Sequence, residues 1–336
     1  MSTYKEAGVD IEKADRFVSF LKDRLKNLNK NLKQALPFGA FAAGFLVEDC
    51  DLVITSTTDG VGTKLKIAQS MNVHNTVGID LVAMNVNDII TTGSKPTAFL
   101  DYIAIGKIEE NLINPIIEGI ITGCEEANTP LVGGETAEMP SFYKDGEYDL
   151  AGFCIGICKK DEVVTGQDVK EGDTIIAIPS SGFHSNGFSL VRYVLEKHNI
   201  KYDAYIKEFG KELWEILLTP TRIYVKDVFE LKNKIKIKAM AHITGGGIPG
   251  NLTRVIPDGL RAVISAYKVP DLFLWFQKLG NIKKEEMYKT FNMGIGFMIV
   301  VQEKDRDIAL STIKDAFIVG HIEQSKDGSK IVLNDI

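Results

Sequence analysis

The chain has 336 residues, a formal net charge of −6, and a composition that is 45% hydrophobic and 25% charged. This length favours two domains of ordinary size over a single core. The sequence has no run of about 18 apolar residues, which excludes a membrane-spanning helix, and its polar first residues are unlike a secretory signal peptide. The acidic balance argues against a general nucleic-acid-binding protein, because such proteins need a basic face.

The cysteines are few and lack the spacing of a metal site. None of them belongs to a CxxC pair, so we expect reduced, structural thiols in a cytoplasmic protein and no metal held by cysteine. The four are Cys50, Cys124, Cys154 and Cys158.

The first half of the chain is predicted to alternate between strands and helices. A polar helical stretch over residues 11–33 and a segment rich in glycine, alanine and phenylalanine over 38–45 come first. Strands are expected at 52–56, 98–105, 131–132 and 148–158, and helices at 81–92 and 114–127.

A polar run over residues 159–173 interrupts the pattern and predicts a domain boundary, with domains of residues 1–168 and 169–336. Strands are then expected at 174–179, 237–242, 262–266 and 296–301, and helices at 188–198 and 220–231. This irregular mixture predicts an α+β (mixed α/β) fold of two similar-sized domains.

One motif combines a carboxylate with a glycine-rich turn. The strand at 52–56 runs into Asp59-Gly60-Val61-Gly62-Thr63-Lys64. Glycines let the backbone approach a ligand, and their N–H groups with the Lys64 charge suit phosphate oxygens. The GxxxxGK[ST] spacing of a P-loop is absent, and a plain surface turn is the alternative.

A second motif is a polar stripe on an otherwise apolar helix. Asn85, Asp88 and Thr92 are spaced three and four apart, which places them on one face. A buried carboxylate without a cation is costly, so a metal ion or a cation from another element should lie opposite Asp88. Buried helix capping is the alternative.

Further acids end apolar runs, at Asp80, Asp101 and Glu135. Ligand groups in α/β proteins often follow strand ends. Together with Asp59 and Asp88, these acids predict an oxygen-ligand site for Mg²⁺ that bridges nucleotide phosphates, although each acid alone is more often structural.

The second half carries two loops of small and polar residues. Residues 180–187, Ser-Ser-Gly-Phe-His-Ser-Asn-Gly, join a strand to a helix, a place where N–H groups face an anion. His184 in this loop is a candidate acid or base, or a donor to phosphate.

The other loop, residues 242–250, contains a literal GxGxxG with Asp271 about 20 residues later, the offset of a dinucleotide fingerprint. Too few residues follow for a full dinucleotide domain, so a phosphate-binding turn is the simpler interpretation. The late segment 290–296 opens a strand with glycines that permit close packing or ligand approach.

Taken in order, the motifs resemble one family. The segments are YKEAGVDI, TDGVGTKL, GIDLVAMNVND, LVGGETAEMP, DLAGFCIG, SSGFHSNGFSLVR, TPTRIYVK, HITGGG and MYKTFNMGIG. They resemble the phosphoribosylformylglycinamidine cyclo-ligase, or aminoimidazole ribonucleotide (AIR) synthetase, family over nearly the whole chain.

The resemblance implies a cytoplasmic homodimeric ligase of purine biosynthesis that uses ATP and Mg²⁺. It would convert formylglycinamidine ribonucleotide (FGAM) to AIR, ADP and phosphate, with no nucleic-acid or membrane partner. It implies an N-terminal mixed-sheet domain that forms the dimer core and a C-terminal α/β/α domain.

The resemblance also assigns roles residue by residue. ATP would contact Asp59, Gly60, Gly62, Thr63 and Lys64. Metal would be held by Asp59, Asp80, Asp88, Asp101 and Glu135. Substrate and its phosphate would contact Ser181, Gly182, His184, Ser185, Asn186, Thr244, Gly245, Gly246 and Asn292. The catalytic residues would be His184, Asn186 and Lys64.

The chain departs from the family pattern before residue 38, where Ala35-Leu36-Pro37 replaces extra glycines. Pro37 restricts the backbone there. Relatives on the same scaffold, such as selenophosphate synthetase, fit less well, because the first cysteine lies beyond the glycine-rich segment. A dinucleotide-dependent oxidoreductase and an inert nucleotide-binding protein are the alternatives from other classes.

Overall fold

The computed structural model describes residues 2–10, 13, 16, 18–21, 33–37, 39–47 and 50–334. The helical stretch predicted for residues 11–33 therefore lies largely outside the described residues. Within those described, no helix has the length and apolar character needed to cross a membrane.

The N-terminal half forms a five-stranded mixed sheet in the order β1-β2-β5-β3-β4. Only the β3–β4 pair is parallel. The strands are β1 (Ala43–Leu46), β2 (Leu52–Gly60), β3 (Lys95–Ile105), β4 (Leu131–Glu138) and β5 (Tyr148–Lys159). The helical elements are η1 (Gly62–Lys64), α2 (Leu65–Met71), α3 (Val77–Thr91) and α4 (Glu110–Glu126).

The C-terminal half forms a six-stranded sheet in the order β13-β10-β12-β6-β11-β9. Its strands are β6 (Thr174–Pro179), β9 (Ala239–His242), β10 (Leu260–Ile264), β11 (Ile295–Val301), β12 (Phe317–Gln324) and β13 (Ile331–Leu333). The helices are α5 (Phe188–Lys197), α6 (Leu213–Leu217), α7 (Val225–Lys232), α8 (Gly247–Leu252), α9 (Asp271–Gly280), α10 (Lys284–Thr290) and α11 (Arg306–Thr312). Both sheets carry helices, which confirms the predicted mixed α/β class.

Several small elements complete the chain. The 3₁₀ turns η2 (Lys160–Glu162), η3 (Thr253–Val255) and η4 (Glu303–Asp305) lie between larger elements. A two-stranded ribbon of β7 (Tyr205–Ile206) and β8 (Lys211–Glu212) precedes α6 and was not predicted.

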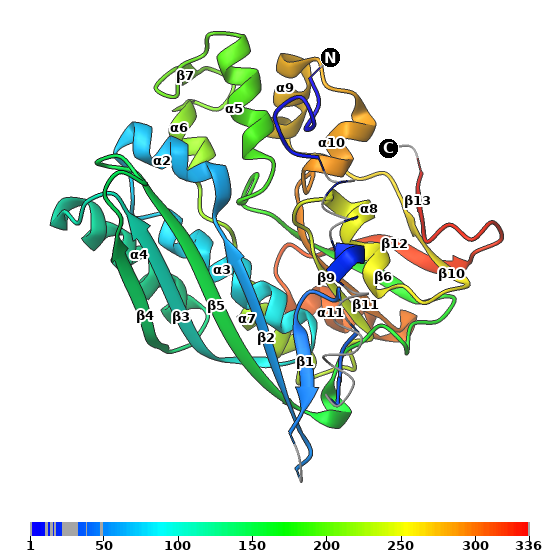
Figure 1. Cartoon of the computed structure of the whole chain (residues 1–336). Coiled ribbons are helices and arrows are strands. Elements are labelled where there is room, and N and C mark those ends of the chain that lie inside the picture. Colours follow the sequence, from blue (N-terminus) through cyan, green and yellow to red (C-terminus); the bar gives the residue numbers. More distant parts are fainter. Residues whose placement is uncertain are drawn as a thin grey trace.

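Helix α3 lies between the two halves of the molecule (Figure 1). Every residue of α3 except Ile79 and Asp88 is buried. The helix packs on β2, β3 and β5 of one sheet and also contacts β9 and α7 of the other half. A helix that is apolar on nearly all sides must be surrounded, and α3 is surrounded by both domains.

Glycines let α3 approach its neighbours closely. A Cβ on Gly78 of α3 would lie 2.4 Å from the Ile116 carbonyl oxygen of α4, and a Cβ on Gly119 would lie 3.2 Å from the Gly78 Cα. On the sheet side, a Cβ on Gly152 of β5 would lie 2.5 Å from Asn85 Nδ2. The position of α3 is therefore set by backbone contact as well as by side-chain packing.

The first residues of the chain pack on the C-terminal half, beside α9 and α10 (Figure 1). The Tyr4 backbone N–H donates to Glu286 Oε1 at 2.7 Å, and Ser2 is buried. Further on, the Ala35 N–H donates to the Gly44 carbonyl and the Ala40 N–H to the Pro37 carbonyl. Pro37 thus lies in a turn that folds the chain back along β1.

The element boundaries differ from prediction in ways that matter for the site. Strand β2 continues to Gly60, so Asp59 lies within a strand, and β3 begins at Lys95, earlier than the predicted residue 98, and contains Asp101 as its predicted span did. Helix α3 begins at Val77, so Asp80 lies in its first turn and does not follow a strand. Helix α7 begins only at Val225, because the preceding residues form an extended segment bound to α3.

Candidate functional site

A buried ion pair between Lys64 and Asp80 lies where the two halves meet. Lys64 Nζ is 2.7 Å from Asp80 Oδ2, and both side chains are fully buried. The ammonium also donates to the His184 and Thr219 carbonyl oxygens at 3.1 and 2.8 Å. Asp80 Oδ1 in turn accepts from the backbone N–H and hydroxyl of Thr221, at 2.8 and 2.6 Å.

Lys64 and Asp80, which were predicted to contact ATP and to hold metal, bind each other in this structure. Burial lowers the pKa of Lys64, and the Asp80 charge opposes that shift. The ammonium donates to three acceptors inside the protein, and Asp80 also accepts two hydrogen bonds from Thr221. The pair fixes the 180–187 loop and the 219–221 segment to the N-terminal domain.

A second polar cluster joins Asp59, Asp88 and His242. Asp88 Oδ1 is 2.8 Å from His242 Nδ1, so a strand-end histidine of the C-terminal sheet binds a carboxylate of α3. Asn85 Nδ2 donates to the Asp59 and Leu81 carbonyl oxygens at 3.3 and 2.9 Å. His242 is thus the side chain from another element that lies against Asp88, where a metal ion or a cation was predicted.

The electrostatics of the cluster favour a bound cation. Burial, and then the nearby Asp88 charge, raise the pKa of Asp59 to about 6, while the Gly60 N–H and His242 oppose the shift. A carboxyl group whose ionisation is disfavoured by a neighbouring carboxylate is stabilised in its charged form by a nearby divalent cation. Mg²⁺ is commonly held by one or two carboxylates together with substrate phosphates, and the Asp59–Asp88 pair fits that mode.

The other predicted metal ligands lie elsewhere. Asp101 is buried within β3, beside Gly134 of β4, and burial raises its pKa. Glu135 lies on the exposed strand β4. Over the described part of the chain, no group of three or more His, Cys, Asp or Glu side chains is arranged to hold a metal ion. The five acids therefore do not form one cage within a single chain.

The predicted substrate loops do come together in the C-terminal domain. Asn186 Oδ1 accepts from the Gly245 N–H at 2.9 Å, and Asn292 Nδ2 donates to the Gly182 carbonyl at 2.9 Å. Asn292 Oδ1 also accepts from Ser180 Oγ and from the Gly294 N–H. Three loops distant in sequence are thereby held as one unit.

Several members of this unit also contact the N-terminal half. Ser185 Oγ lies 3.1 Å from the hydroxyl of Thr221, which binds Asp80. Thr63 Oγ1 lies 3.1 Å from Ser189 Oγ at the start of α5. Asn186 Nδ2 lies 4.0 Å from the Met84 sulfur of α3. The glycine-rich turn after β2 and the 180–187 loop thus lie side by side.

His184, the candidate acid, base or phosphate donor, lies inside the 180–187 loop. Its side chain is buried, and its Nε2 accepts the Ser181 N–H at 3.2 Å. Burial, and then the charges of His242, Lys64 and Arg222, hold the pKa of His184 well below its ordinary value. A neutral ring that accepts at Nε2 carries its hydrogen on Nδ1, and the backbone φ of +60° marks a constrained loop. The buried His184 ring therefore stabilises the conformation of its own loop through the bond from the Ser181 N–H.

One or more glycines in each turn adopt the left-handed backbone conformation. Gly62 has φ of +72°, and a Cβ there would meet nothing within 4 Å, which leaves its surroundings open. Gly246 has φ of +93° and precedes α8. Strand β9 before this turn pairs antiparallel with β11, whereas a dinucleotide fingerprint needs a parallel βαβ unit. The oxidoreductase alternative therefore loses its structural basis.

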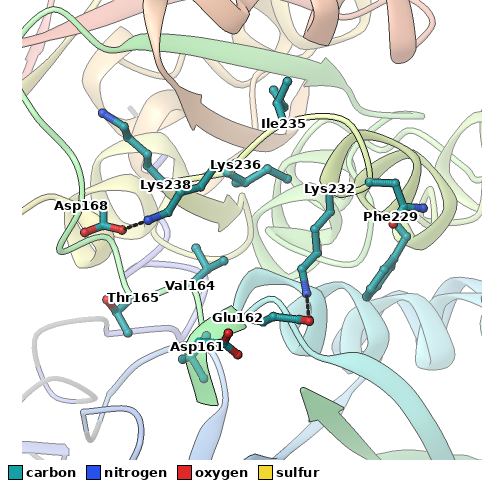
Figure 2. A pocket seen from close by; sticks show the side chains of 13 residues that line it. Asp161, Glu162, Val164, Thr165, Asp168, Phe229, Lys232, Ile235, Lys236 and Lys238 are labelled. Atoms are coloured by element: carbon teal, nitrogen blue, oxygen red, sulfur yellow. Dashed lines mark hydrogen bonds and ion pairs between the residues drawn. The ribbon is translucent and has the colours of Figure 1, made fainter. Parts of the chain in front are cut away.

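Two cavities differ in their position relative to the predicted site residues. One of about 520 Å³ lies along the linker after β5 and is shown in Figure 2. Its lysines are paired, Lys232 with Glu162 and Lys236 with Asp168, and it contains none of the predicted site residues. The other, of about 440 Å³, borders Gly246 and is also lined by Tyr4 of the N-terminal segment.

Comparisons with known proteins agree with this geometry. Two family models match the chain, "AIR synthase related protein, N-terminal domain" over residues 42–158 and "AIR synthase related protein, C-terminal domain" over residues 170–332. The chain belongs to the AIR synthase family. The sheet of β1–β5 lies within the first match, apart from the last residue of β5, and the sheet of β6–β13 lies within the second apart from Leu333.

Similar family members share most of the length of this chain. A relative from Thermoanaerobacter pseudethanolicus is 49% identical, covering 97% of this chain and 98% of its own. A Myxococcus xanthus relative is 46% identical, covering 99% of both. Both are named phosphoribosylformylglycinamidine cyclo-ligase.

Solved structures show the same fold at low sequence identity. The structure titled "AaThiL complexed with AMPPCP and TMP" has a TM-score of 0.66 at 17% identity, covering 93% of this chain and 92% of its own. The hydrogenase maturation protein HypE in complex with ATP has a TM-score of 0.60 at 14% identity, covering 86% and 83%. At this identity the likeness concerns the fold alone.

Sequence reasoning missed the groups that connect the two domains. Asn87 of α3 accepts from the Tyr224 N–H and donates to the Arg222 carbonyl, at 3.0 and 2.9 Å. His242 was noted only as part of a glycine turn. The available signal was the polar ring of His242 at the end of the otherwise apolar, buried strand β9, because a buried polar group needs a partner.

Replacing Lys64 by Met should lower the free energy of unfolding by about 3 to 5 kcal/mol, because Asp80 is left buried without its cation. The matched control is Lys66→Met, since the Lys66–Glu147 pair, at 2.8 Å, is nearly as short as the 2.7 Å Lys64–Asp80 pair but is exposed, and this change should cost under about 1 kcal/mol. Urea unfolding of the three proteins measures both effects. Equal losses in the two variants would contradict the role given to the buried pair.

Asp59 should make stability depend on pH. Its folded pKa of about 6 lies above the ordinary value of 3.8, so its ionisation opposes folding, and stability contributed by this group is lost as pH rises from about 4 to 6. Asp59→Asn removes the penalty while keeping an acceptor for the Gly60 N–H. The free energy of unfolding of the variant should match that of the wild type near pH 4 and exceed it by roughly 3 kcal/mol above pH 7, in urea unfolding with EDTA. A difference that is constant with pH would contradict the shift.

Proposed function

We propose that the chain is a phosphoribosylformylglycinamidine cyclo-ligase, which uses ATP to close the imidazole ring of AIR. The observation that carries the proposal is the joining of a carboxylate pair, Asp59 and Asp88, to a preformed set of substrate loops through part-buried polar contacts. Family membership and the names of full-length relatives support the same reaction.

The reaction needs an activated oxygen. The formyl amide oxygen of FGAM attacks the γ-phosphorus of ATP, the bond to the ADP oxygen breaks, and an imidate phosphate ester forms. The neighbouring amidine nitrogen then attacks the activated carbon, and the phosphate departs with that oxygen. The protein has mainly to position the reactants and to neutralise charge on the transferring group.

The residues divide these tasks. Asp59 and Asp88 would hold Mg²⁺, which supplies positive charge to the phosphate oxygens when bound. Gly60, Gly62 and Thr63 would contact ATP from the turn after β2. The N–H groups and side chains of Ser181, Asn186 and Gly245 would orient FGAM, and the cavity beside Gly246 offers room for part of it. Because Lys64 and His184 are buried, their part is to fix the loops.

The N-terminal sheet supports the proposal of a homodimer. Strand β5 alternates strictly between buried and less buried residues, with its buried face toward α3. Phe153 and Ile157 on the other face are 45% and 36% exposed, and they pair with Thr58 and Ile54 of β2. A sheet face with large apolar side chains requires a covering layer, and a second copy of the chain is the occupant that we propose.

The proposed location is the cytoplasm. The described cysteines are all free, and three of the four are buried. Burial raises the pKa of Cys124 to about 12, so that thiol is unreactive. Unpaired thiols of this kind suit a reducing compartment.

The enzymatic proposal predicts ADP release that requires both ATP and FGAM, with one AIR formed for each ADP. Asp88→Asn should lower this turnover at least about 100-fold with the fold retained, because the site loses a metal-binding charge. Asp161→Asn in the linker groove is the matched control and should leave turnover unchanged. Turnover of Asp88→Asn near the wild-type rate would remove that residue from the site, and wild-type protein without FGAM-dependent ADP release would refute the function.

The dimer proposal predicts twice the monomer mass in sedimentation equilibrium. Phe153→Lys should shift the protein to monomer, because a charge at the centre of the apolar face cannot be desolvated cheaply. Leu274→Lys, which changes an equally exposed apolar residue on α9, should remain dimeric. A monomeric wild type would refute the proposed interface.

A further inference from the structure

We propose that His242 is a positioning residue for the reaction, whose ring N–H holds Asp88 so that the second carboxylate oxygen, together with Asp59, receives the metal–nucleotide complex. This inference rests on the proposed function for its chemistry. It assigns to a C-terminal-domain residue the task of setting a group of the N-terminal domain.

The surroundings of His242 explain why the ring adopts one orientation. It ends β9, where Ala239, Met240 and Ala241 are buried like the histidine itself. The Phe297 ring lies 6.3 Å from it, centroid to centroid, at 34°. Close packing on all sides leaves the ring little freedom to turn away from Asp88.

The hydrogen bond fixes which ring nitrogen carries hydrogen. An ionised carboxylate only accepts, so His242 Nδ1 donates to Asp88 Oδ1 across 2.8 Å. The other ring nitrogen, Nε2, is buried and without a hydrogen-bond partner in the structure. An unpaired buried polar atom destabilises the fold, and a phenylalanine would fill the same space without it. Packing alone therefore does not account for a histidine here, whereas the bond to Asp88 does.

This bond occupies only one of the two carboxylate oxygens of Asp88. It is one of two α3 residues that are not buried, and its side chain is 14% exposed. Within the described residues, His242 is the side chain that donates to its carboxylate, at one oxygen only. Without that donor, the repulsion between Asp88 and Asp59 would favour turning the carboxylate away. The histidine thus keeps the two acids together for a shared cation.

The same bond also places the substrate turn. His242 lies two residues before Thr244 and three before Gly245, whose N–H binds Asn186. Fixing the end of β9 against α3 therefore sets the distance between the acids and the loop that holds the substrate. A positioning residue at this point affects both metal binding and turnover.

The test compares two variants that differ in the donor. His242→Asn retains an N–H donor near the position of Nδ1, whereas His242→Phe retains the ring and its contact with Phe297 but has no donor. Mn²⁺ binding in the presence of a non-hydrolysable ATP analogue, followed by the electron paramagnetic resonance of free Mn²⁺, reports on the acids without turnover. FGAM-dependent ADP release gives kcat and KM.

We expect His242→Phe to weaken Mn²⁺ binding at least about 10-fold and to lower kcat about 100-fold, with a melting temperature close to that of the wild type. His242→Asn should bind Mn²⁺ within about 3-fold of the wild type and recover most of kcat. This rescue is the result that a purely structural role of the ring would not produce.

Two results would overturn the proposal: wild-type Mn²⁺ affinity in a folded His242→Phe protein, or equal losses in both variants. If His242→Phe does not fold, the Asn variant decides, since weakened Mn²⁺ binding by a folded His242→Asn protein refutes the role. A wild type that binds Mn²⁺ with the analogue but releases no ADP with FGAM refutes the enzyme function alone, because the metal-binding comparison still tests the positioning of Asp88.

Discussion

The structure depends on one buried helix, most of whose polar side chains bind groups outside it. Helix α3 contributes Asp80 to Lys64 and Thr221, Asn87 to the segment before α7, and Asp88 to His242. A polar group in an apolar interior is tolerated only when it is paired. Most of these partners belong to the C-terminal half. The hydrogen bonds that pair the polar side chains of α3 are therefore also the bonds that join the two domains.

This constraint explains why the site needs no flexible element between its two parts. The acids on β2 and α3 and the loops around Asn186 are connected through part-buried hydrogen bonds of 2.8 to 3.3 Å. Phosphoryl transfer depends on holding two reactants in line, so a rigid frame contributes directly to rate. The histidine in the 180–187 loop and the lysine after β2, which look like reactive groups, instead supply that rigidity.

Much of the fold could be predicted from periodicity and turns, because the strands and long helices have strong patterns. The apolar stripe of α3, the strand at 148–158 and the polar linker near 159–173 all have counterparts in the structure. Boundaries were less predictable, since β2 and β3 extend through polar residues that only cross-strand pairing stabilises. The start of α7 depends on Asn87, which lies far away in sequence.

The candidate site was predictable in composition but not in pairing. Loops rich in glycine, serine and asparagine were singled out, and the structure brings the C-terminal ones together. Nothing local indicated that Lys64 and Asp80 neutralise each other, because 16 residues and a helix start separate them. Charge partners are set by tertiary structure. The spacing of the motifs therefore could not reveal that Lys64 and Asp80 bind each other.

The close approach of α3 to its neighbours at Gly78, Gly119 and Gly152 has a consequence for reading genetic variation in this protein. A methyl group at any of these sites would displace the helix sideways, carrying Asn85 and Asp88 out of register with β9. In a growth screen, such substitutions would have the same effect as substitutions in the active site, although the changed residues do not contact substrate. The folding of inactive variants recovered from a selection should therefore be measured before any changed residue is assigned a role in catalysis.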